Sequence, residues 1–216
     1  MKLKKEQMQL YAVTDRRWTG RQTLLEQVRE ALDGGITCLQ LREKQMDFGS
    51  FVKEAEAVKK LCLRYKVPLI INDNMDVALE SGADGVHIGQ KDMVLSQARK
   101  KAGDRLIIGV SAHNKAEAVE AEKNGADYLG CGAVFGSTTK NDAGVITLDT
   151  IAEICASVSV PVVAIGGINK DNLLQLCGTG IDGAALISAI FSASHIKKEC
   201  QELFCLTQKV AASSKK

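Results

Sequence analysis

The sequence predicts one domain built as a closed barrel of eight parallel strands that alternate with helices, the (β/α)8 class. Three observations favour this class: eight short apolar runs, a helical period between most of them, and a phrase that recurs along the chain. The 216 residues divide into eight units of about 27 residues, which suits a compact TIM barrel. An open doubly wound sheet is the alternative, but the segment TDRRWTGRQT after the first apolar run lacks the glycine-rich turn typical of that fold.

The recurring phrase places a glycine shortly before an apolar run. It reads DGGITCLQLRE at 33–43, ESGADGVHIGQ at 80–90, KNGADYLGCGA at 123–133 and GTGIDGAALIS at 178–188. Successive copies are 47, 43 and 55 residues apart, measured from the glycines Gly35, Gly82, Gly125 and Gly180. A further apolar run precedes each copy, so strands are expected at 9–14, 37–42, 68–72, 85–88, 106–110, 127–131, 161–165 and 183–187.

Two of the intervening segments have a clear helical period. In 48–65 the apolar residues recur at three- and four-residue steps and are expected to face the barrel: Phe48, Phe51, Val52, Ala55, Val58, Leu61, Cys62 and Tyr65. In 23–35, which ends in glycine, the same is expected of Leu24, Leu25, Val28, Ala31 and Leu32. Within the single domain 1–216, residues 1–8 are expected to be an N-terminal extension and 211–216 a frayed tail.

Composition excludes several classes of protein. Apolar residues make up 45% and charged residues 25% of the chain, which is typical of a globular protein with a sizeable core. The net charge is only +2 and Lys and Arg are spread along helical faces, which argues against a nucleic-acid partner. The N-terminus lacks the apolar stretch of a signal peptide, and no apolar run approaches the roughly 20 residues of a membrane helix. We therefore expect a cytoplasmic protein with no membrane partner.

Two patterns imitate sites of other proteins but lack what those sites need. The seven cysteines form no C-x-x-C pair and lie in apolar segments, which favours buried free thiols over a disulfide framework or a zinc site. GCGAVFG at 130–136 resembles a dinucleotide fingerprint, but it has the wrong glycine spacing and lies late in the chain. Small residues where a strand meets a loop explain this second pattern.

The second strand directs polar side chains to one side of the barrel. In TCLQLREKQMD at 37–47, Leu39 and Leu41 share one parity, while Gln40, Arg42 and Lys44 share the other. We expect the second set to line the interior and to rise toward the carboxyl end of the strand, where barrel enzymes hold their active sites. Two cations there indicate an anionic ligand. A salt bridge to Glu43 or to an acid of a neighbouring strand explains them equally well, and this strand alone does not decide.

Other strand ends bring further polar groups to the same rim. Asn72 and Asp73 end the third strand and Asp92 follows the fourth, which indicates a hard metal ion such as Mg²⁺ shared with a phosphate group. Helix N-capping is the alternative for either aspartate. Ser111 and His113 end the fifth strand, and GSTTK at 136–140 offers hydroxyls and a third lysine, or is only a polar turn.

The last two strands indicate a second anion site. IGGI at 165–168 and ISAI at 187–190 are expected to present backbone N–H groups, each before a helix start, where barrels commonly bind phosphate. The rim is therefore expected to bring two phosphorylated ligands together.

The histidines and the first long loop are less decisive. His87 is expected to be a hydrogen-bonded interior residue, His113 a candidate ligand contact, and His195 a surface residue. Trp18 and Arg21 lie in the loop after the first strand, which is either a lid or a long connection.

Together these motifs resemble the thiamine phosphate synthase family. QLREK, IINDN, GVHIGQKD, GVSAH, TTK, AIGGI and LISAI occur in the family's order across nearly the whole chain. The resemblance implies a transferase that joins 4-amino-5-hydroxymethyl-2-methylpyrimidine diphosphate to a thiazole phosphate, giving thiamine phosphate and pyrophosphate, with one Mg²⁺ per active site. It leaves the oligomeric state open, a homo-oligomer included.

The resemblance also implies a role for each matching residue. The pyrimidine diphosphate would be held by Gln40, Arg42, Glu43, Lys44, Asn72, Ser111 and Lys140. Mg²⁺ would be held by Asp73 and Asp92, and the thiazole phosphate by Ser137, Thr138, Thr139, Gly167, Ile187 and Ser188. Of these, Arg42, Lys44 and Lys140 would be catalytic. The chain departs from the family at Gly136-Ser137, where Pro-Thr is usual, so the order of that loop and its effect on thiazole binding stay open.

The implied reaction is a dissociative substitution. The bond to pyrophosphate breaks early, the aminopyrimidine stabilises the methylene cation, and the thiazole nitrogen captures it, so charge stabilisation and alignment matter more than a general base. The related thiazole tautomerase, with His113 as its acid–base group, is one alternative. A non-catalytic barrel that senses or carries a phosphate metabolite is another.

Overall fold

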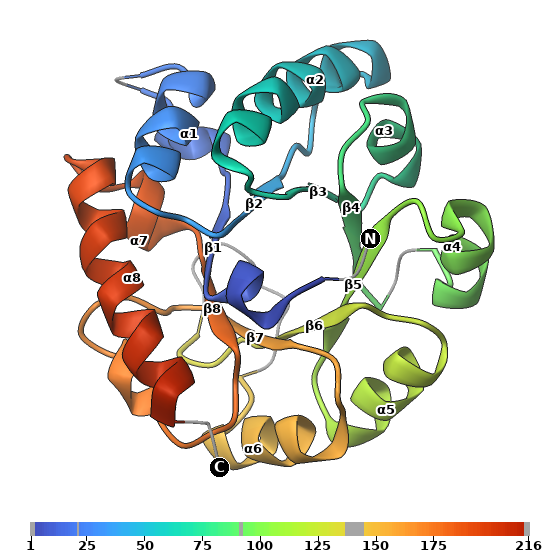
Figure 1. The fold of residues 1–216 in the computed structure, drawn as a ribbon, viewed down its shortest axis with the longest axis vertical. Coiled ribbons are helices and arrows are strands. Elements are labelled where there is room, and N and C mark those ends of the chain that lie inside the picture. The colour runs from blue at the N-terminus through green and yellow to red at the C-terminus, as the bar shows by residue number, and fades with distance from the viewer. Residues whose placement is uncertain (1–2, 21, 91–92, 137–144, 214–216) are drawn as a thin grey trace.

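The computed structural model describes residues 3–20, 22–90, 93–136 and 145–213 and is a closed barrel of eight parallel strands in sequential order (Figure 1). The strands are β1 (Leu10–Val13), β2 (Cys38–Leu41), β3 (Leu69–Asn72), β4 (Gly85–Ile88), β5 (Ile107–Ala112), β6 (Tyr128–Cys131), β7 (Val162–Ile165) and β8 (Gly183–Leu186). The predicted (β/α)8 fold is confirmed. Each expected strand is found within two residues at either end.

Helices surround this barrel and follow the strands in order (Figure 1). They are α1 (Leu24–Asp33), α2 (Phe48–Tyr65), α3 (Met75–Glu80), α4 (Leu95–Ala102), α5 (Lys115–Lys123), α6 (Leu148–Ser157), α7 (Ser188–Phe191) and α8 (Ile196–Ser213). Between β7 and β8 the described chain has only the short 3-10 helix η3 (Leu173–Leu176). A second 3-10 helix, η2 (Arg16–Trp18), lies between β1 and α1.

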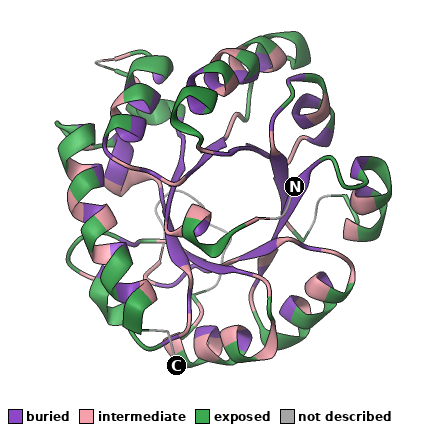
Figure 2. Cartoon of the chain, in the orientation of Figure 1, coloured by how far each residue is buried: buried purple, intermediate pink, exposed green. Residues whose placement is uncertain are grey.

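The inner faces of the helices pack on the strands, which are buried on both sides (Figure 2). Three residues expected on those inner faces are exposed instead: Leu25, Phe48 and Tyr65. Phe48 begins α2 and Tyr65 ends it, so both extend beyond the barrel wall. Leu25 lies at the edge of the apolar stripe in the first turn of α1. The predicted helices are therefore confirmed, but the predicted buried face of each included residues at its edge or ends that are exposed.

The recurring phrase corresponds to one structural device at the amino-terminal end of the barrel. The side chain of the residue just before each even-numbered strand accepts a backbone N–H from the first or second residue of the strand before it. The four bonds are Leu10 N to Thr37 Oγ1 (2.9 Å), Leu69 N to Asp84 Oδ2 (2.7 Å), Ile108 N to Asp127 Oδ2 (2.8 Å) and Val162 N to Asp182 Oδ2 (3.0 Å). The phrase's glycines adopt positive φ angles of 92°, 66°, 94° and 91°, which glycine tolerates best.

The N-terminal residues close the amino-terminal opening of the barrel. The 3-10 helix η1 (Lys5–Met8) crosses that opening, and Met8 is fully buried in an interior cluster with Tyr11, Ile70 and Tyr128 (Figure 1). The expected extension thus begins as a plug. At the other terminus α8 continues to Ser213, whose Oγ accepts the N–H of Gly178, so 211–213 are helical rather than frayed.

The cysteines are free thiols, but not all of them are buried as expected. Cys177 and Cys205 are exposed, because both lie on the outer layer beyond the barrel wall. Burial raises the pKa of the Cys62 thiol to about 12. Within the described ranges, no helix is long and apolar enough to cross a membrane.

Candidate active site

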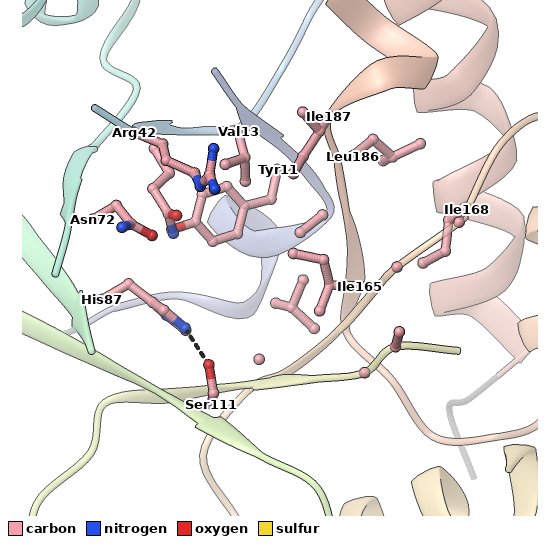
Figure 3. Close-up of a pocket in the computed structure, with 18 of the residues that line it drawn as sticks. Tyr11, Val13, Arg42, Asn72, His87, Ser111, Ile165, Ile168, Leu186 and Ile187 are labelled. Atoms are coloured by element: carbon pink, nitrogen blue, oxygen red, sulfur yellow. Dashed lines mark hydrogen bonds between the residues drawn. The ribbon is translucent and has the colours of Figure 1, made fainter. Parts of the chain in front are cut away.

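A cavity of about 110 Å³ opens at the carboxyl-terminal ends of the strands (Figure 3). Every strand contributes a side chain or backbone group to its lining, because the carboxyl ends of parallel strands in a closed barrel meet around one axis. The lining includes Gln40, Arg42, Asn72, Ser111, Gly167, Ile187 and Ser188 from the predicted site. The sequence therefore correctly predicted that these residues lie together at this end of the barrel, and their roles stay predictions.

Two of the residues that line the cavity carry buried hydrogen-bond donors with no described partner. Arg42 is largely buried and its Nη1 lies 3.4 Å from Asp15 Oδ2, while its Nε has no partner among the described residues. Asn72 is buried and its Nδ2 likewise has no described partner. A buried donor without an acceptor is costly, so both groups are candidates to hydrogen-bond a ligand that offers acceptor oxygens.

Lys44 and Glu43 do not line this cavity. The side chain of Lys44 is 52% exposed, and its Nζ lies 2.9 Å from Asp73 Oδ2. Glu43 Oε2 accepts a hydrogen bond of 2.7 Å from Arg16 Nε. Because β2 ends at Leu41, strand parity no longer governs these positions, and the expectation that Lys44 lines the interior was wrong. Salt bridges to acids that follow neighbouring strands, the alternative left open, are present for both Arg42 and Lys44.

Asp73 has a backbone conformation that is rare outside glycine. Its φ is 62°, and the N–H of Asn74 donates to the carbonyl of Asn72 at 2.8 Å, so the chain turns sharply at Asp73 just after β3. The N-cap of α3 is Asn74, whose Oδ1 accepts the N–H of Val77, so the capping alternative for Asp73 is wrong. A constrained carboxylate beside Asn72 suits a hard cation. The second expected ligand, Asp92, lies outside the described residues.

Burial penalises the charged form of two carboxyls at this rim, but it decides the pKa of only one of them. Burial alone would raise the pKa of Asp15, but hydrogen bonds from Arg17 and the charge of Arg42 lower this pKa overall. For Glu43 burial prevails and its pKa is raised, since Arg16 is shared with Glu54. Two neighbouring carboxyls therefore shift in opposite directions.

The floor of the cavity contains three residues that sequence reasoning did not assign to the site: Tyr11, Tyr128 and His87. His87 Nδ1 lies 3.0 Å from the Tyr128 hydroxyl, and its Nε2 lies 3.0 Å from Ser111 Oγ (Figure 3). His87 is thus a hydrogen-bonded interior histidine, as expected, but one that also lines the cavity. The lumen parity of Tyr11 and Tyr128, two residues before Val13 and Gly130, was the signal that could have found them.

His113 lines the outer part of the cavity. Its Nδ1 lies 2.9 Å from Glu117 Oε2, one helical turn further along the chain. Burial alone would raise the pKa of Glu117, but hydrogen bonds from His113 lower it below its ordinary value. His195, by contrast, is on the surface as expected.

The expected second anion site lies on the opposite wall. Gly167, Ile187 and Ser188 line the cavity, and the Gly167 backbone packs closely against the carbonyl of Gly136. Only Ile187 leads directly into a helix, α7; after β7 the chain turns before η3, so the expected helix start after 165–168 was wrong. Ser137, Thr138, Thr139 and Lys140 lie outside the described residues.

The position of the family's usual proline has a backbone that proline cannot adopt. Gly136 has a φ of 74°, whereas the proline ring fixes φ near −65°. The conformation of Gly136 is therefore one that a proline at this position would not allow. In the loop after β1, Trp18 is partly exposed and does not line the cavity, and Arg21 lies outside the described residues.

A model of the thiamine monophosphate synthase family matches residues 10–190. The chain belongs to the thiamine-phosphate synthase family. It is 47% identical to the thiamine-phosphate synthase of Clostridium acetobutylicum over 96% of its own length and 98% of the relative's. It is 48% identical to that of Ruminiclostridium cellulolyticum, over 90% and 92%. Membership of this synthase family makes the chain a transferase enzyme.

Solved structures agree with this assignment. The thiamine phosphate pyrophosphorylase of Pyrococcus furiosus superposes with a TM-score of 0.89 at 42% identity, covering 95% of this chain and 98% of that one. A 3-hexulose-6-phosphate synthase has a TM-score of 0.69 at 17% identity and shares the fold alone. The solved structures thus support the barrel fold.

Proposed function

We propose that this chain condenses 4-amino-2-methyl-5-(diphosphooxymethyl)pyrimidine with 4-methyl-5-(2-phosphooxyethyl)thiazole, giving thiamine phosphate and pyrophosphate. The observation that supports this most is the pair of unused buried donors, Arg42 Nε and Asn72 Nδ2, at a cavity whose opposite wall is backbone around Gly167 and Ile187. A diphosphate offers acceptor oxygens to the first wall. Backbone N–H groups suit the smaller phosphate at the second.

In the proposed reaction the bond between the pyrimidine methylene carbon and the diphosphate oxygen breaks first. The ring amino group donates electron density to the methylene cation, and the thiazole nitrogen then forms the new bond. Arg42, with Lys44 and Lys140, stabilises the charge that grows on the departing diphosphate. Asn72 and Ser111 fix its orientation, and Gln40 and Glu43 belong to the same substrate set. Ser137, Thr138, Thr139, Gly167, Ile187 and Ser188 hold the thiazole phosphate in line.

One Mg²⁺ per site is part of the proposal. When bound, it would neutralise part of the diphosphate charge, with Asp73 and Asp92 as its protein ligands. The oxygen chemistry of Asp73 and Asn72 fits such an ion.

The direct test is incubation of the protein with both phosphorylated substrates and Mg²⁺. Release of pyrophosphate, together with a product of the mass of thiamine phosphate, is expected only when both substrates are present. Binding of either substrate without turnover would instead support a sensor or carrier. Asp92→Ala is expected to abolish most Mg²⁺-dependent turnover with the fold retained, and unchanged turnover would remove Asp92 from the mechanism.

A thiazole tautomerase is the second candidate, because His113 and Glu117 form an acid–base pair at the cavity. It predicts proton exchange on the thiazole phosphate alone, with no pyrophosphate. His113→Gln would then abolish activity, whereas the synthase proposal expects this variant to keep most of it. A cytoplasmic location and a homo-oligomer stay predictions.

A further inference from the structure

Five polar side chains from five different strands or strand ends form one continuous chain of hydrogen bonds across the cavity floor. We call it the floor chain: Gln40, Tyr11, Tyr128, His87 and Ser111. Its links measure 2.9 Å from Gln40 Nε2 to the Tyr11 hydroxyl, 2.8 Å between the two tyrosine hydroxyls, and 3.0 Å each from Tyr128 to His87 Nδ1 and from His87 Nε2 to Ser111 Oγ. Gln40, Tyr11, Tyr128 and His87 are buried, so the links are sheltered from water.

Both tyrosines in the chain are neutral hydroxyls. Burial, and then the neighbouring hydroxyl, raise the pKa of Tyr11 well above its ordinary value. Burial likewise raises the pKa of Tyr128. A neutral hydroxyl has one hydrogen to donate, and so does a neutral imidazole. Each link can therefore use only one hydrogen, and the direction of one link constrains the next.

One consistent direction of hydrogen bonding starts at the Gln40 amide and runs through the whole chain. In this direction Gln40 donates to Tyr11, Tyr11 donates to Tyr128, and Tyr128 donates to His87 Nδ1. His87 must then carry its own hydrogen on Nε2 and donate it to Ser111 Oγ. Ser111 accepts this bond, and its hydroxyl hydrogen is left for a group in the cavity that Ser111 lines.

The reverse direction would give the rim the wrong polarity for an anion. If the Gln40 amide were turned around, every link would reverse, and the Ser111 hydrogen would be consumed by His87. Ser111 would then offer the cavity only lone pairs. A diphosphate oxygen needs donors, so only the first direction makes Ser111 attractive to the leaving group.

The interior of the barrel is shaped around this chain. A Cβ on Gly109 would lie 2.0 Å from Tyr128 Cζ, so the Tyr128 ring occupies the space that glycine leaves. A Cβ on Gly130 would lie 3.0 Å from His87 Cε1. The two rings are therefore held by close contact as well as by hydrogen bonds, and the links have little freedom to separate.

We propose that Tyr11, Tyr128 and His87 are positioning residues: they transmit the polarity of the Gln40 amide across the barrel floor, hold His87 as the neutral Nε2–H tautomer, and turn the Ser111 hydroxyl hydrogen toward the diphosphate. This inference rests on the proposed function for the identity of the ligand. The tautomer itself does not depend on that function.

The tautomer is measured on the ligand-free protein by ¹⁵N NMR of its three histidines. His87 is expected to have an unprotonated Nδ1 and a protonated Nε2, with assignment by comparison with His87→Gln. A protonated Nδ1 would reverse the chain and overturn the proposal. Tyr128→Phe removes the link that defines Nδ1 as an acceptor, so its His87 signals are expected to shift toward a mixture of tautomers.

Equilibrium binding then measures how breaking the floor chain changes the affinity for each ligand. For Tyr128→Phe the dissociation constant of the pyrimidine diphosphate with Mg²⁺, measured by calorimetry, is expected to rise about tenfold, the loss typical of one hydrogen bond to a charged group. That of the thiazole phosphate is expected to stay within about twofold, because its wall lies apart from the floor chain. Tyr65→Phe is the matched control, since it removes a hydrogen-bonded hydroxyl on the outer surface, 2.7 Å from Asp33. Equal weakening of both ligands would indicate a merely structural role and overturn the proposal.

Conservative replacements of His87 distinguish its two nitrogens. Glutamine reaches as far as Nε2 and keeps a donor for Ser111, whereas asparagine reaches only to Nδ1 and keeps an acceptor for Tyr128. We expect His87→Gln to bind the pyrimidine diphosphate more tightly than His87→Asn, and the opposite ranking would overturn the proposal. If wild-type protein does not bind this ligand at all, the proposed function fails, and the tautomer of His87 still decides the polarity of the chain.

Discussion

At the amino-terminal end of the barrel, Asp84, Asp127 and Asp182 each accept a strand N–H and each contact a cation of their own: Lys59 at 2.6 Å, Arg99 at 2.5 Å and Lys5 at 2.8 Å. At the carboxyl-terminal end the charged and polar groups are not all paired in this way. Arg16 serves two carboxylates, and buried polar atoms of Arg42, Glu43 and Asn72 have no described partner. The residues of the amino-terminal end, Asp84, Asp127 and Asp182, belong to the phrase that recurs in the sequence. The residues of the carboxyl-terminal end, Arg42, Glu43 and Asn72, lie outside that phrase's shared pattern, at the ends of β2 and β3.

The difference teaches which charged residues stabilise the fold and which await a ligand. A buried charge with complete hydrogen bonding holds elements together, and removing its partner destabilises the protein. A buried donor without an acceptor lowers the stability of the free protein, and this cost is removed when an anion binds and accepts its hydrogen bond. The two ends should therefore respond in opposite ways to the same kind of substitution.

The largest effect is expected from removing the Arg42 charge. Arg42→Met should lower the turnover number about a thousandfold, because one preorganised donor at developing negative charge is worth about 4 kcal/mol. Its free energy of unfolding should stay the same or rise, since Arg42 Nε has no described partner and Asp15 keeps Arg17. Pyrophosphate release and urea unfolding measure the two quantities.

Arg99→Met is the matched control at the other end. Arg99 binds the carbonyls of Gly125 and Leu106 and the carboxylate of Asp127, so its loss should reduce stability. The turnover number of the folded protein should not change. If Arg99→Met impaired turnover as Arg42→Met does, the distinction between the ends would be lost.

Next in size is the replacement of Asp84. Asp84→Ala leaves Lys59 and the N–H of Leu69 without their acceptor in a largely buried place, and should cost about 3 kcal/mol of unfolding free energy. Thr37 occupies the equivalent position of the first repeat and accepts only the N–H. Asp84→Thr should therefore lose less stability than Asp84→Ala. Equal losses in chemical denaturation would mean that the N–H bond contributes nothing.

A substitution between the two ends should affect stability and binding together. Gly109→Ala puts a methyl group into the Tyr128 ring and should cost about 1–3 kcal/mol by overpacking. It should also weaken binding of the pyrimidine diphosphate, because the floor chain is displaced. Gly130→Ala, with its milder contact to His87, should have the same effects at smaller size. A Gly109→Ala protein that is destabilised but binds normally would separate the floor chain from the site.

Much of the fold was readable because its signals are local. Strand parity, helical period and the glycine of the repeat each act within a few residues, so the strands were found to within two residues. β5 was drawn short because Ser111, read as a rim residue, still belongs to the strand. Gln40, Arg42 and Asn72 reached one cavity for the same reason, since topology alone brings the carboxyl ends of strands together.

What the sequence did not reveal depends on distant parts of the chain. Lys44 turns to Asp73 and Glu43 to Arg16 because of the paths of loops, which parity does not describe. Tyr11 and Tyr128 stand 117 positions apart and meet only across the barrel axis. Their apolar neighbours made them look like core residues, and the polar use of their hydroxyls is visible only once the barrel is closed.

The smallest predicted effect concerns the carboxylates that share one cation. Burial raises the pKa of Glu43, and Arg16 offsets this only in part because Glu54 uses the same guanidinium. Glu54→Gln leaves Arg16 to Glu43 alone, so the pKa of Glu43 should fall. A titration of the Glu43 carboxyl followed by NMR measures it directly.

The same change has a sign in stability that can be checked. With a raised pKa, folded Glu43 binds a proton that the unfolded chain has already released, so its contribution is present below the ordinary pKa and is lost as the pH rises through the raised value. Replacing Glu54 narrows the pH range between the ordinary pKa of Glu43 and its raised value. The unfolding free energy of Glu54→Gln, relative to wild type, should therefore increase as the pH rises through it. A difference that is flat with pH would mean that Glu54 does not compete for Arg16, and that this carboxylate pair is as well provided with cations as those at the amino-terminal end.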